Sequence, residues 1–193
     1  MIDDKLSAAI LGGGKSRRFG EPKAFAVYQG KKLIDYAVDL AKQIAPHVFL
    51  VNGRTVGYEE VGIPIISDLI PDLGPIGGLY TALKSSTTPY IAALPVDTPL
   101  LTVAAYRLLF QYMEKDRPVV ALSDKGLEPL ISIWPASMLY LVEQQIQEKN
   151  YSLRALFSQN EAVVVDFPQI MEDYNPQFFL NINYKKDLLA HKP

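Results

Sequence analysis

The chain has 193 residues, of which 49% are hydrophobic and 21% are charged, so it is long enough and apolar enough to bury a continuous core. Nineteen Lys and Arg against twenty-one Asp and Glu give a net charge of −2, which provides no overall field for binding nucleic acid. The absence of cysteine excludes disulfides, thiolate nucleophiles and Cys-ligated metal centres. We expect a single domain over residues 1–193.

We expect no secretion signal in the amino-terminal segment. Asp3 and Asp4 stand where a signal peptide would be positively charged, and the apolar run that follows them is short and ends in glycines. Nowhere do about 18 apolar residues follow one another, the length that a membrane-spanning helix needs. The sequence therefore predicts a cytoplasmic protein without a membrane partner.

Apolar runs typical of strands alternate with segments of helical period along the whole chain. This alternation predicts an α/β fold in which a Rossmann-like, mostly parallel sheet is covered by helices on both faces. The expected strands are residues 6–11, 47–52, 63–66, 90–94, 118–123, 131–134, 162–166 and 178–183. The first expected helix has an apolar stripe from Leu33 to Ile44, and the others cover residues 76–85, 102–115, 136–149 and 152–158.

Several polar or glycine positions follow directly after expected strands. They are Gly12 to Gly14, Asn52, Asp68 and Asp97. In open α/β sheets, ligands bind beyond the carboxyl ends of the strands, where the connecting loops converge. We therefore expect these four loops to meet in one crevice.

The first of these loops, LGGGKSRRFGEPK at residues 11–23, has the features of a phosphate-binding loop. Its three adjacent glycines let backbone N–H groups approach a phosphate without interference from a Cβ atom. Lys15, Arg17, Arg18 and Lys23 add four positive charges within nine residues. A glycine cluster alone would indicate only a tight turn, but the flanking cations favour binding of a triphosphate.

Two well-known glycine motifs do not match this loop. A P-loop ending at Gly14, Lys15 and Ser16 would need a glycine where the chain has Ala9. A dinucleotide-binding G-x-G-x-x-G motif starting at Gly12 would need a glycine where the chain has Arg17. The loop is thus of neither kind.

The loop resembles the L-A-G-G-x-S-x-R-M-G-x-x-K signature of the molybdenum cofactor guanylyltransferases, the MobA family. Four further segments resemble that family in order and spacing, so the resemblance spans nearly the whole chain: DLIPDLGPIGGLYTAL, LPVDTPLL, LEPLISIW and FLNINYKKDL. The chain departs from the family pattern at Gly12, Phe19 and Glu128, where the family usually has alanine, methionine and histidine. The change at Glu128 concerns the pterin side of the site.

The resemblance implies a nucleotidyltransferase (GT-A-like) fold and the transfer of GMP from GTP to molybdenum-bearing molybdopterin, with release of pyrophosphate. It implies Mg²⁺ as cofactor, held by Asp97, and Arg18, Lys23 and Asp97 as catalytic residues. The residues that it implies at or near the nucleotide are Leu11, Gly12, Gly13, Gly14, Lys23, Asn52, Asp68, Gly78, Asp97, Asn181 and Asn183. We expect a monomer that contacts other proteins of cofactor biosynthesis only transiently.

Each of these polar residues has a purely structural alternative. Asp97 could cap the helix that follows it, and Asn52 and Asp68 could form local Asx-turns. Asn181 and Asn183 alternate along the expected strand 178–183 and could be a solvent-facing stripe. Arg154 reads as a solvated residue beside an apolar stripe, and we leave it out of the site.

Other functions remain open at this stage. One is a cytidylyltransferase for the same pterin, or a sugar-phosphate or methylerythritol-phosphate nucleotidyltransferase of the same fold. The cytidylyl relatives usually read L-A-A-G, whereas this chain has Gly13 at the third position. Another is a non-catalytic module that binds a nucleotide without transferring it.

Overall fold

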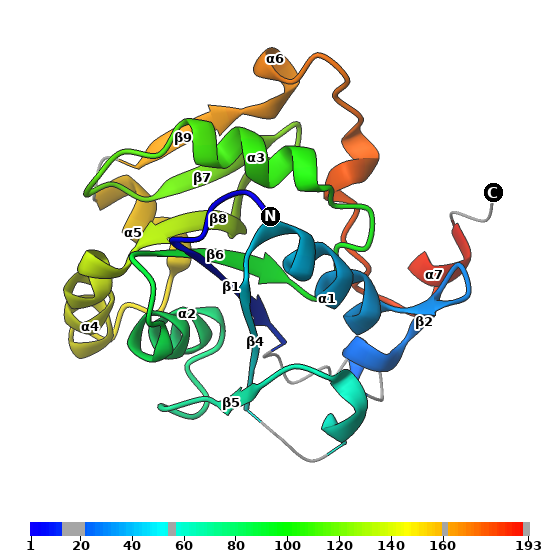
Figure 1. Ribbon diagram of the computed structural model, residues 1–193, viewed down its shortest axis with the longest axis horizontal. Coiled ribbons are helices and arrows are strands. Elements are labelled where there is room, and N and C mark those ends of the chain that lie inside the picture. Colours follow the sequence, from blue (N-terminus) through cyan, green and yellow to red (C-terminus); the bar gives the residue numbers. More distant parts are fainter. Residues whose placement is uncertain (13–21, 54–56, 160–161, 191–193) are drawn as a thin grey trace.

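The computed structural model describes residues 1–12, 22–53, 57–159 and 162–190, which form a seven-stranded sheet with helices on both faces (Figure 1). The strand order is β5-β4-β1-β6-β8-β7-β9. A separate two-stranded sheet pairs β2 with β3. The predicted α/β architecture is therefore confirmed.

One half of the large sheet is wholly parallel. It contains β1 (Leu6–Leu11), β4 (His47–Asn52), β5 (Ile65–Ser67) and β6 (Tyr90–Pro95). The central strand β1 lies between β4 and β6 and is buried along its whole length. Continuous apolar runs such as LSAAIL are typical of such strands, because helices cover both of their faces, and the predicted strands here agree with the structure to within two residues at either end.

The other half of the sheet is mixed. The long strand β8 (Gly126–Pro135) is antiparallel to β6 and to β7 (Val119–Ser123), and β9 (Val163–Asp166) is parallel to β7. The partner of Val120 is Ser132, but the partner of Ala121 is Glu128, so three residues of β8 bulge out of the ladder. Pro129 is one of them and has no N–H to donate, which explains why the strand was predicted only over residues 131–134.

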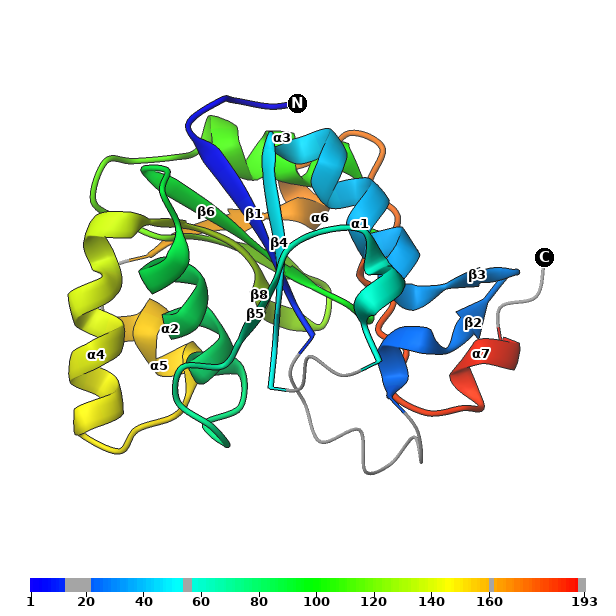
Figure 2. The ribbon, with the colours of Figure 1, turned by 60° about the horizontal axis from the view of Figure 1, so that its bottom comes forward.

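The helices cover the two faces in two groups (Figure 2). Helices α1 (Leu33–Ile44), α3 (Val103–Gln111) and α6 (Phe167–Ile170) pack with Ala8 and Ile10. Helices α2 (Pro75–Ser85), α4 (Leu139–Gln147) and α5 (Leu153–Gln159) pack with Ala9 and Leu11. Successive side chains of β1 point to opposite faces of the sheet and thus contribute to two separate cores. Helix α3 ends four residues before the predicted end, and α4 is preceded by the 3₁₀ helix η3 (Ala136–Met138).

The small β2–β3 hairpin (Val27–Tyr28 and Lys31–Lys32) was not predicted. Its two turn residues, Gln29 and Gly30, both have positive φ, as a two-residue hairpin turn requires. The carboxyl-terminal helix α7 (Asp187–Ala190) lies beside this hairpin (Figures 1 and 2). Tyr28, Leu33 and Ile182 form the small apolar core between them, and Leu188 packs against it.

The predicted strand at residues 178–183 is wrong. This segment begins within the 3₁₀ helix η4 (Pro176–Phe179) and then runs extended without joining a sheet. The backbone N–H of Ile182 donates a hydrogen bond to the carbonyl oxygen of Asp97 at 2.9 Å. This hydrogen bond and the burial of Ile182 fasten the segment beside the end of β6.

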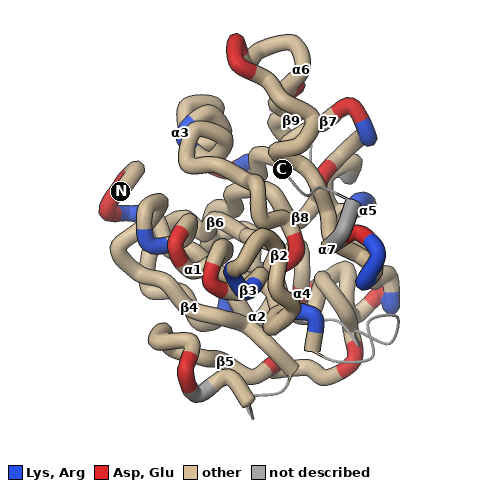
Figure 3. The backbone as a smooth tube through the Cα atoms, turned by 90° about the vertical axis from the view of Figure 1, so that its right-hand side faces the viewer, with Lys and Arg blue, Asp and Glu red and all other residues tan. Residues whose placement is uncertain are grey.

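In the part of the chain that the structure describes, no helix has the length and apolar character needed to cross a bilayer. Figure 3 shows acidic and basic positions interspersed over the described backbone. This distribution agrees with the near-zero net charge of the sequence.

Candidate functional site

The predicted site residues after β1, β4, β5 and β6 lie at one edge of the sheet. These four strands are parallel neighbours, so their carboxyl ends point the same way. Gly12 follows β1, Asn52 ends β4, Asp68 follows β5, and Asp97 lies in the turn after β6. The sheet thus brings together loops that are far apart in the sequence.

Gly12 lies where the chain leaves β1 and passes close to β4. Its N–H donates a hydrogen bond to the carbonyl oxygen of Val51 at 2.9 Å, which continues the pairing of the two strands. A Cβ atom at this position would come within 3.0 Å of Leu50 Cδ1 and 3.6 Å of Asn52 Oδ1. Glycine fits this close approach of β4, and a Cβ atom here would require the Leu50 side chain to shift slightly.

Asp68 and Asn52 form the neighbouring part of this edge. A Cβ atom on Gly53 would lie 3.1 Å from Asp68 Oδ2, so the carboxyl group sits directly over the backbone that follows Asn52. Burial raises the pKa of the Asp68 carboxyl group. Its Oδ1 atom is buried without a hydrogen-bond partner among the described residues. An acceptor in this state is costly to bury, so it is a good candidate for contact with a ligand.

Asn52 is 7% exposed, and its side chain hydrogen-bonds to the hydroxyl of Tyr58, whose pKa is raised mainly by burial. Tyr58 also packs its ring against Phe25, with centroids 4.7 Å apart. Sequence reasoning missed Tyr58, because it lies in an irregular segment with no pattern of its own. The expected alternative of a local Asx-turn does not account for this contact of Asn52.

Leu11 and Gly78 are in contact across the interface between β1 and α2. A Cβ atom on Gly78 would lie 3.6 Å from Leu11 Cδ2, which is an ordinary packing distance. At the neighbouring Gly77 the same atom would be 3.0 Å from Leu73 Cβ and 3.3 Å from the carbonyl oxygen of Ile70. The tighter requirement for glycine in this helix therefore falls on Gly77.

Lys23, Asp97, Asn181 and Asn183 form one polar cluster. Lys23 begins the short 3₁₀ helix η1 (Lys23–Phe25), and its Nζ atom lies 2.6 Å from Asp97 Oδ2. The same ammonium donates to Asn183 Oδ1 at 3.1 Å and to Asn181 Oδ1 at 3.5 Å. The side chains of Lys23 and Asp97 are only 14% and 19% exposed. Three segments separated by 74 to 160 positions thus meet at one ammonium group.

The contacts of Asp97, Asn181 and Asn183 differ from the purely structural alternatives expected for them. Asp97 does not cap helix α3, because Thr102 is the N-cap and accepts a hydrogen bond from the N–H of Ala105 at 3.3 Å. Asn181 and Asn183 are exposed residues, yet both reach the same lysine, while Ile182 between them is buried. The predicted alternation of side chains therefore holds, although the predicted strand does not.

The donor set of this cluster fits a hard divalent cation. Mg²⁺ takes oxygen ligands and is usually held by one or two carboxylates together with waters and substrate phosphates. Asp97 supplies the carboxylate, and the two asparagines supply amide oxygens that already face a cation. Among the described residues, no group of three or more His, Asp or Glu offers a separate metal site.

Three predicted site residues, Gly13, Gly14 and Arg18, lie outside the residues that the structure describes. Their roles stay predictions. Gly12 and Lys23 are the nearest of the predicted site residues on either side of this segment, and they lie at the β1 and Asp97 ends of the candidate site.

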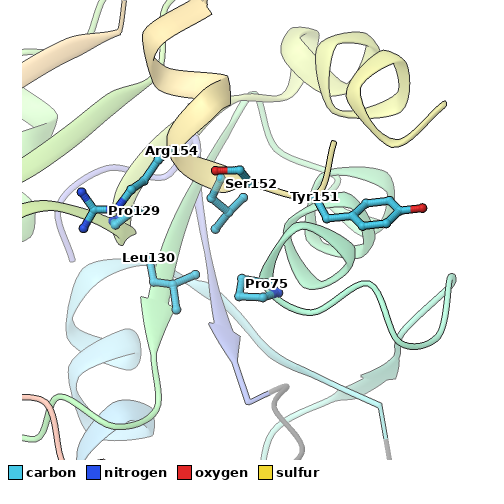
Figure 4. A pocket seen from close by; sticks show the side chains of 7 residues that line it. Pro75, Pro129, Leu130, Tyr151, Ser152 and Arg154 are labelled. Carbon is cyan, nitrogen blue, oxygen red and sulfur yellow. The ribbon is translucent and has the colours of Figure 1, made fainter. Parts of the chain in front are cut away.

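A cavity of about 260 Å³ opens beside the parallel edge (Figure 4). Figure 4 shows side chains from three elements around it: Pro75 from the first turn of α2, Pro129 and Leu130 from β8, and Tyr151, Ser152 and Arg154 from the start of α5 and the residues before it. The bulge in β8 exposes Pro129 and Leu130 to this space. The lining is mostly apolar, and Arg154 is the one cation among its described residues. A hydrogen bond from the Arg154 guanidinium to the carbonyl oxygen of Leu127 at 2.9 Å holds this side chain in place.

Glu128 precedes the bulge and is held by the β7–β8 hairpin. Its carboxylate accepts a hydrogen bond from the Ser123 hydroxyl at 2.8 Å. Burial raises the pKa of Glu128, an effect that Ser123, Lys125 and Arg154 oppose. These partners give Glu128 a role in the hairpin, and we do not place it in the candidate site.

Comparison with known proteins supports this geometry. The family model described as "MobA-like NTP transferase domain" matches residues 8–163. The "Probable molybdenum cofactor guanylyltransferase" of Carboxydothermus hydrogenoformans is 32% identical over 94% of this chain and 92% of its own. The "Molybdenum cofactor guanylyltransferase" of Sinorhizobium fredii is 30% identical over 95% of this chain and 89% of its own.

A solved structure agrees with the fold. The molybdopterin-guanine dinucleotide biosynthesis protein A of Archaeoglobus fulgidus superposes with a TM-score of 0.80 at 23% identity, covering 95% of each chain. The residues that the family model matches include both Gly12 and Asp97. The chain therefore belongs to the MobA-like NTP transferase family, a family of nucleotidyltransferase enzymes.

Proposed function

We propose that the chain transfers the GMP moiety of GTP to molybdopterin that carries molybdenum, with release of pyrophosphate and formation of the guanine dinucleotide cofactor. Relatives named for this activity match more than nine-tenths of the chain. One structural observation favours guanylyl transfer over transfer of another nucleotide. The buried Oδ1 atom of Asp68 has no hydrogen-bond partner among the described residues.

Guanine fits this carboxylate better than cytosine does. Guanine presents two adjacent donors, the ring N1–H and the 2-amino group, and a carboxylate can accept both in parallel. Cytosine presents one amino donor beside an acceptor nitrogen, which would face a carboxylate oxygen unfavourably. We therefore assign Asp68 to the base, with Asn52 beside it, and both lie next to the strand that leads into the glycine turn.

The phosphates would lie between Gly12 and Lys23. Gly12 closely approaches β4, and glycines allow backbone N–H groups to face an anion. Lys23 brings a cation to the other side, at the end of β6. Leu11, Gly78 and the residues Gly13, Gly14 and Arg18 complete the proposed nucleotide site.

The chemistry suits a site without a strong general base. A phosphate monoester has a second pKa near ~6, so the acceptor phosphate is already largely ionised when it attacks the α-phosphorus of GTP. The bond from the α-phosphorus to the bridging oxygen breaks, and pyrophosphate leaves. What the chain must supply is in-line positioning and cancellation of negative charge. Mg²⁺, held by Asp97, would neutralise phosphate charge when bound, and Lys23 would stabilise the charge on the leaving group.

We place the acceptor in the cavity beside the bulge of β8. The cavity is bounded by the first turn of α2 on one side and by β8, the strand that pairs with β6, on the other. Its apolar walls and Tyr151 suit a flat ring system, and Arg154 suits an anionic group. Its volume of about 260 Å³ admits one such ring.

A panel of nucleotides tests the proposal. Purified protein with Mg²⁺ and molybdenum-bearing molybdopterin is given GTP, CTP, ATP or UTP, and pyrophosphate release is measured. GTP should support turnover at least about a hundredfold faster than the others, because a site built to accept two donor groups rejects bases that lack them. Faster release with CTP would contradict the assignment to guanylyl transfer.

Binding can be tested apart from turnover by the thermal protection that each nucleotide gives. GTP should raise the midpoint of unfolding more than CTP at equal concentration, because a ligand that binds the folded state stabilises it. Asp68→Ala should remove most of this preference. Protection by GTP without turnover under any acceptor condition would point to a binding module in place of a transferase.

A further inference from the structure

The ammonium group of Lys23 lies inside a ring of side-chain oxygens. Asp97 Oδ2 is 2.6 Å away, Asn183 Oδ1 is 3.1 Å away, and Asn181 Oδ1 is 3.5 Å away. These oxygens come from the turn after β6 and from the segment that follows η4. That segment is anchored by the hydrogen bond from Ile182 N–H to the Asp97 carbonyl oxygen at 2.9 Å. The ring is therefore held by the fold.

A carboxylate with two amide oxygens also forms a ligand set for a divalent cation. An ammonium ion and a divalent ion compete for such a site, since both are attracted by the same oxygen atoms. The low exposure of the Lys23 and Asp97 side chains strengthens this competition, because their attraction is less screened by water. A divalent ion on Asp97 would lie close to the Lys23 ammonium, and the two cations would repel each other.

We propose that Lys23 is a placeholder for the divalent cation: in the nucleotide-free protein its ammonium occupies the cation position between Asp97, Asn181 and Asn183. A divalent ion binds this position tightly only when a nucleotide phosphate draws Lys23 away. The two asparagines then act as further ligands of the ion. This second step rests on the proposed function, because it needs a phosphate near Lys23.

The placeholder couples the two ligands. By itself the divalent ion must displace an ion pair, and by itself the nucleotide must detach Lys23 from Asp97. When both bind, the ion takes the carboxylate and the phosphate takes the ammonium, so each charge keeps a partner. The presence of one ligand therefore raises the affinity for the other, and this effect is reciprocal.

Binding of Mn²⁺, measured by electron paramagnetic resonance in the absence of nucleotide, tests the proposal. Wild-type protein should bind Mn²⁺ weakly, and Lys23→Met should bind it about tenfold more tightly, the gain expected if the ion pair closes the site in about nine of ten molecules. Lys31→Met is the matched control, because it removes the ammonium from another lysine–aspartate pair, Lys31 with Asp39. It should leave Mn²⁺ binding unchanged.

A second set of variants tests whether the side-chain oxygens bind the ion directly or whether Lys23 only repels it through its charge. In the Lys23→Met background, the neutral changes Asn181→Ala and Asn183→Ala should each weaken Mn²⁺ binding several-fold, and Asp97→Asn should abolish it. If Lys23 acted only by long-range repulsion, the asparagine changes would have no effect. Circular dichroism checks that each variant folds, and Lys23→Ala provides the same measurement if methionine does not pack.

Equal Mn²⁺ affinity of wild-type and Lys23→Met proteins without nucleotide would overturn the proposal, as would no loss in either asparagine variant. These measurements involve neither GTP nor the pterin acceptor. If the nucleotide panel selected another triphosphate, guanylyl transfer would fail while the Mn²⁺ result still stood. If Mn²⁺ bound equally to both proteins, the placeholder would fail while guanylyl transfer still stood.

Discussion

The two ends of the candidate site differ in how their charges are satisfied. At the β6 end, the Asp97 carboxylate is paired with Lys23 at 2.6 Å and has two asparagines beside it. At the β5 end, the Asp68 carboxyl group is partly buried, and its Oδ1 atom has no hydrogen-bond partner among the described residues. The carboxylate at the β6 end is thus paired within the protein before a ligand binds. The carboxyl group at the β5 end has an oxygen atom that can accept a hydrogen bond from a ligand.

This difference has a physical consequence for each end. Ligands at the paired end must replace the contact between Lys23 and Asp97 with contacts of their own. Binding of the divalent ion there therefore depends on binding of the nucleotide. Ligands at the unpaired end gain a hydrogen bond to a group that is already desolvated, so that end can discriminate between bases.

The largest effect is expected for Asp97→Asn. The variant keeps the shape of the side chain but loses the charge that pairs with Lys23 and holds the divalent ion. Turnover should fall about a thousandfold, comparable with the loss of one preorganised charge-stabilising group at other active sites. Steady-state pyrophosphate release measures it. A variant that kept a tenth of wild-type activity would remove Asp97 from the centre of the reaction.

Lys23→Met should lower turnover by about a hundredfold, because the departing phosphate loses a cation that contributes in the transition state. The loss should appear mainly in kcat, since the other cations and the glycine turn still bind the ground state. Lys84→Met is a suitable control: Lys84 lies in the last turn of α2, forms an exposed pair with Glu143 at 3.5 Å, and takes no part in the polar cluster. An unchanged kcat in Lys23→Met would contradict the proposed role.

Asp68→Asn should weaken GTP binding about tenfold, because one of the two parallel hydrogen bonds to guanine is replaced by a facing donor. The same change should stabilise the nucleotide-free protein by about 1 kcal/mol or less, since it removes a partly buried charge whose Oδ1 atom has no hydrogen-bond partner among the described residues. Calorimetric titration and thermal unfolding measure the two effects. Stability and affinity changing in the same direction would contradict the assignment.

The stability difference between wild-type and Asp68→Asn should depend on pH. Burial raises the pKa of Asp68 in the folded state above its ordinary value near 3.8. The folded wild type therefore holds its proton more tightly than the unfolded chain, and it loses stability as the pH rises from that ordinary value through the raised one. The advantage of the variant should be present at neutral pH and vanish near pH ~3. An advantage independent of pH would exclude this cause.

The smallest effect concerns packing. Gly12→Ala would place Cβ 3.0 Å from the Cδ1 atom of Leu50, which is fully buried, so the variant should lose about 1 kcal/mol of stability. Gly78→Ala is the matched comparison, because its Cβ would make an ordinary contact of 3.6 Å and alanine favours a helix. Denaturant unfolding should give Gly78→Ala a higher free energy of unfolding than Gly12→Ala. The reverse order would contradict the close approach of Gly12 to Leu50.

The sequence predicts the parallel half of the sheet well and the rest less well. Runs such as YIAAL at residues 90–94 are apolar because both faces are covered, and this pattern is visible without a structure. In β8, the pattern is interrupted by Pro129 and by the bulge, so its first half could not be predicted. The segment 178–183 alternates like a strand, but no neighbouring strand pairs with it.

The site was predicted as a set of residues but not as a set of contacts. That Asp97 and Gly12 share an edge follows from the order of strands. Lys23 pairs with Asp97 and also contacts Asn183, which is 160 positions away. These contacts depend on how the carboxyl-terminal segment folds back, and no local sequence pattern encodes them. Tyr58 was missed for the same reason, because its contact with Asn52 arises only in the folded chain.

The contrast between the two ends is tested most directly by a crystal structure with Mg²⁺ and a non-hydrolysable GTP analogue. We expect Lys23 Nζ to move from Asp97 to a phosphate oxygen, the ion to lie on Asp97, and guanine to donate to Asp68 Oδ1. A bound analogue with the Lys23–Asp97 pair intact, or with its base away from Asp68, would contradict this expectation.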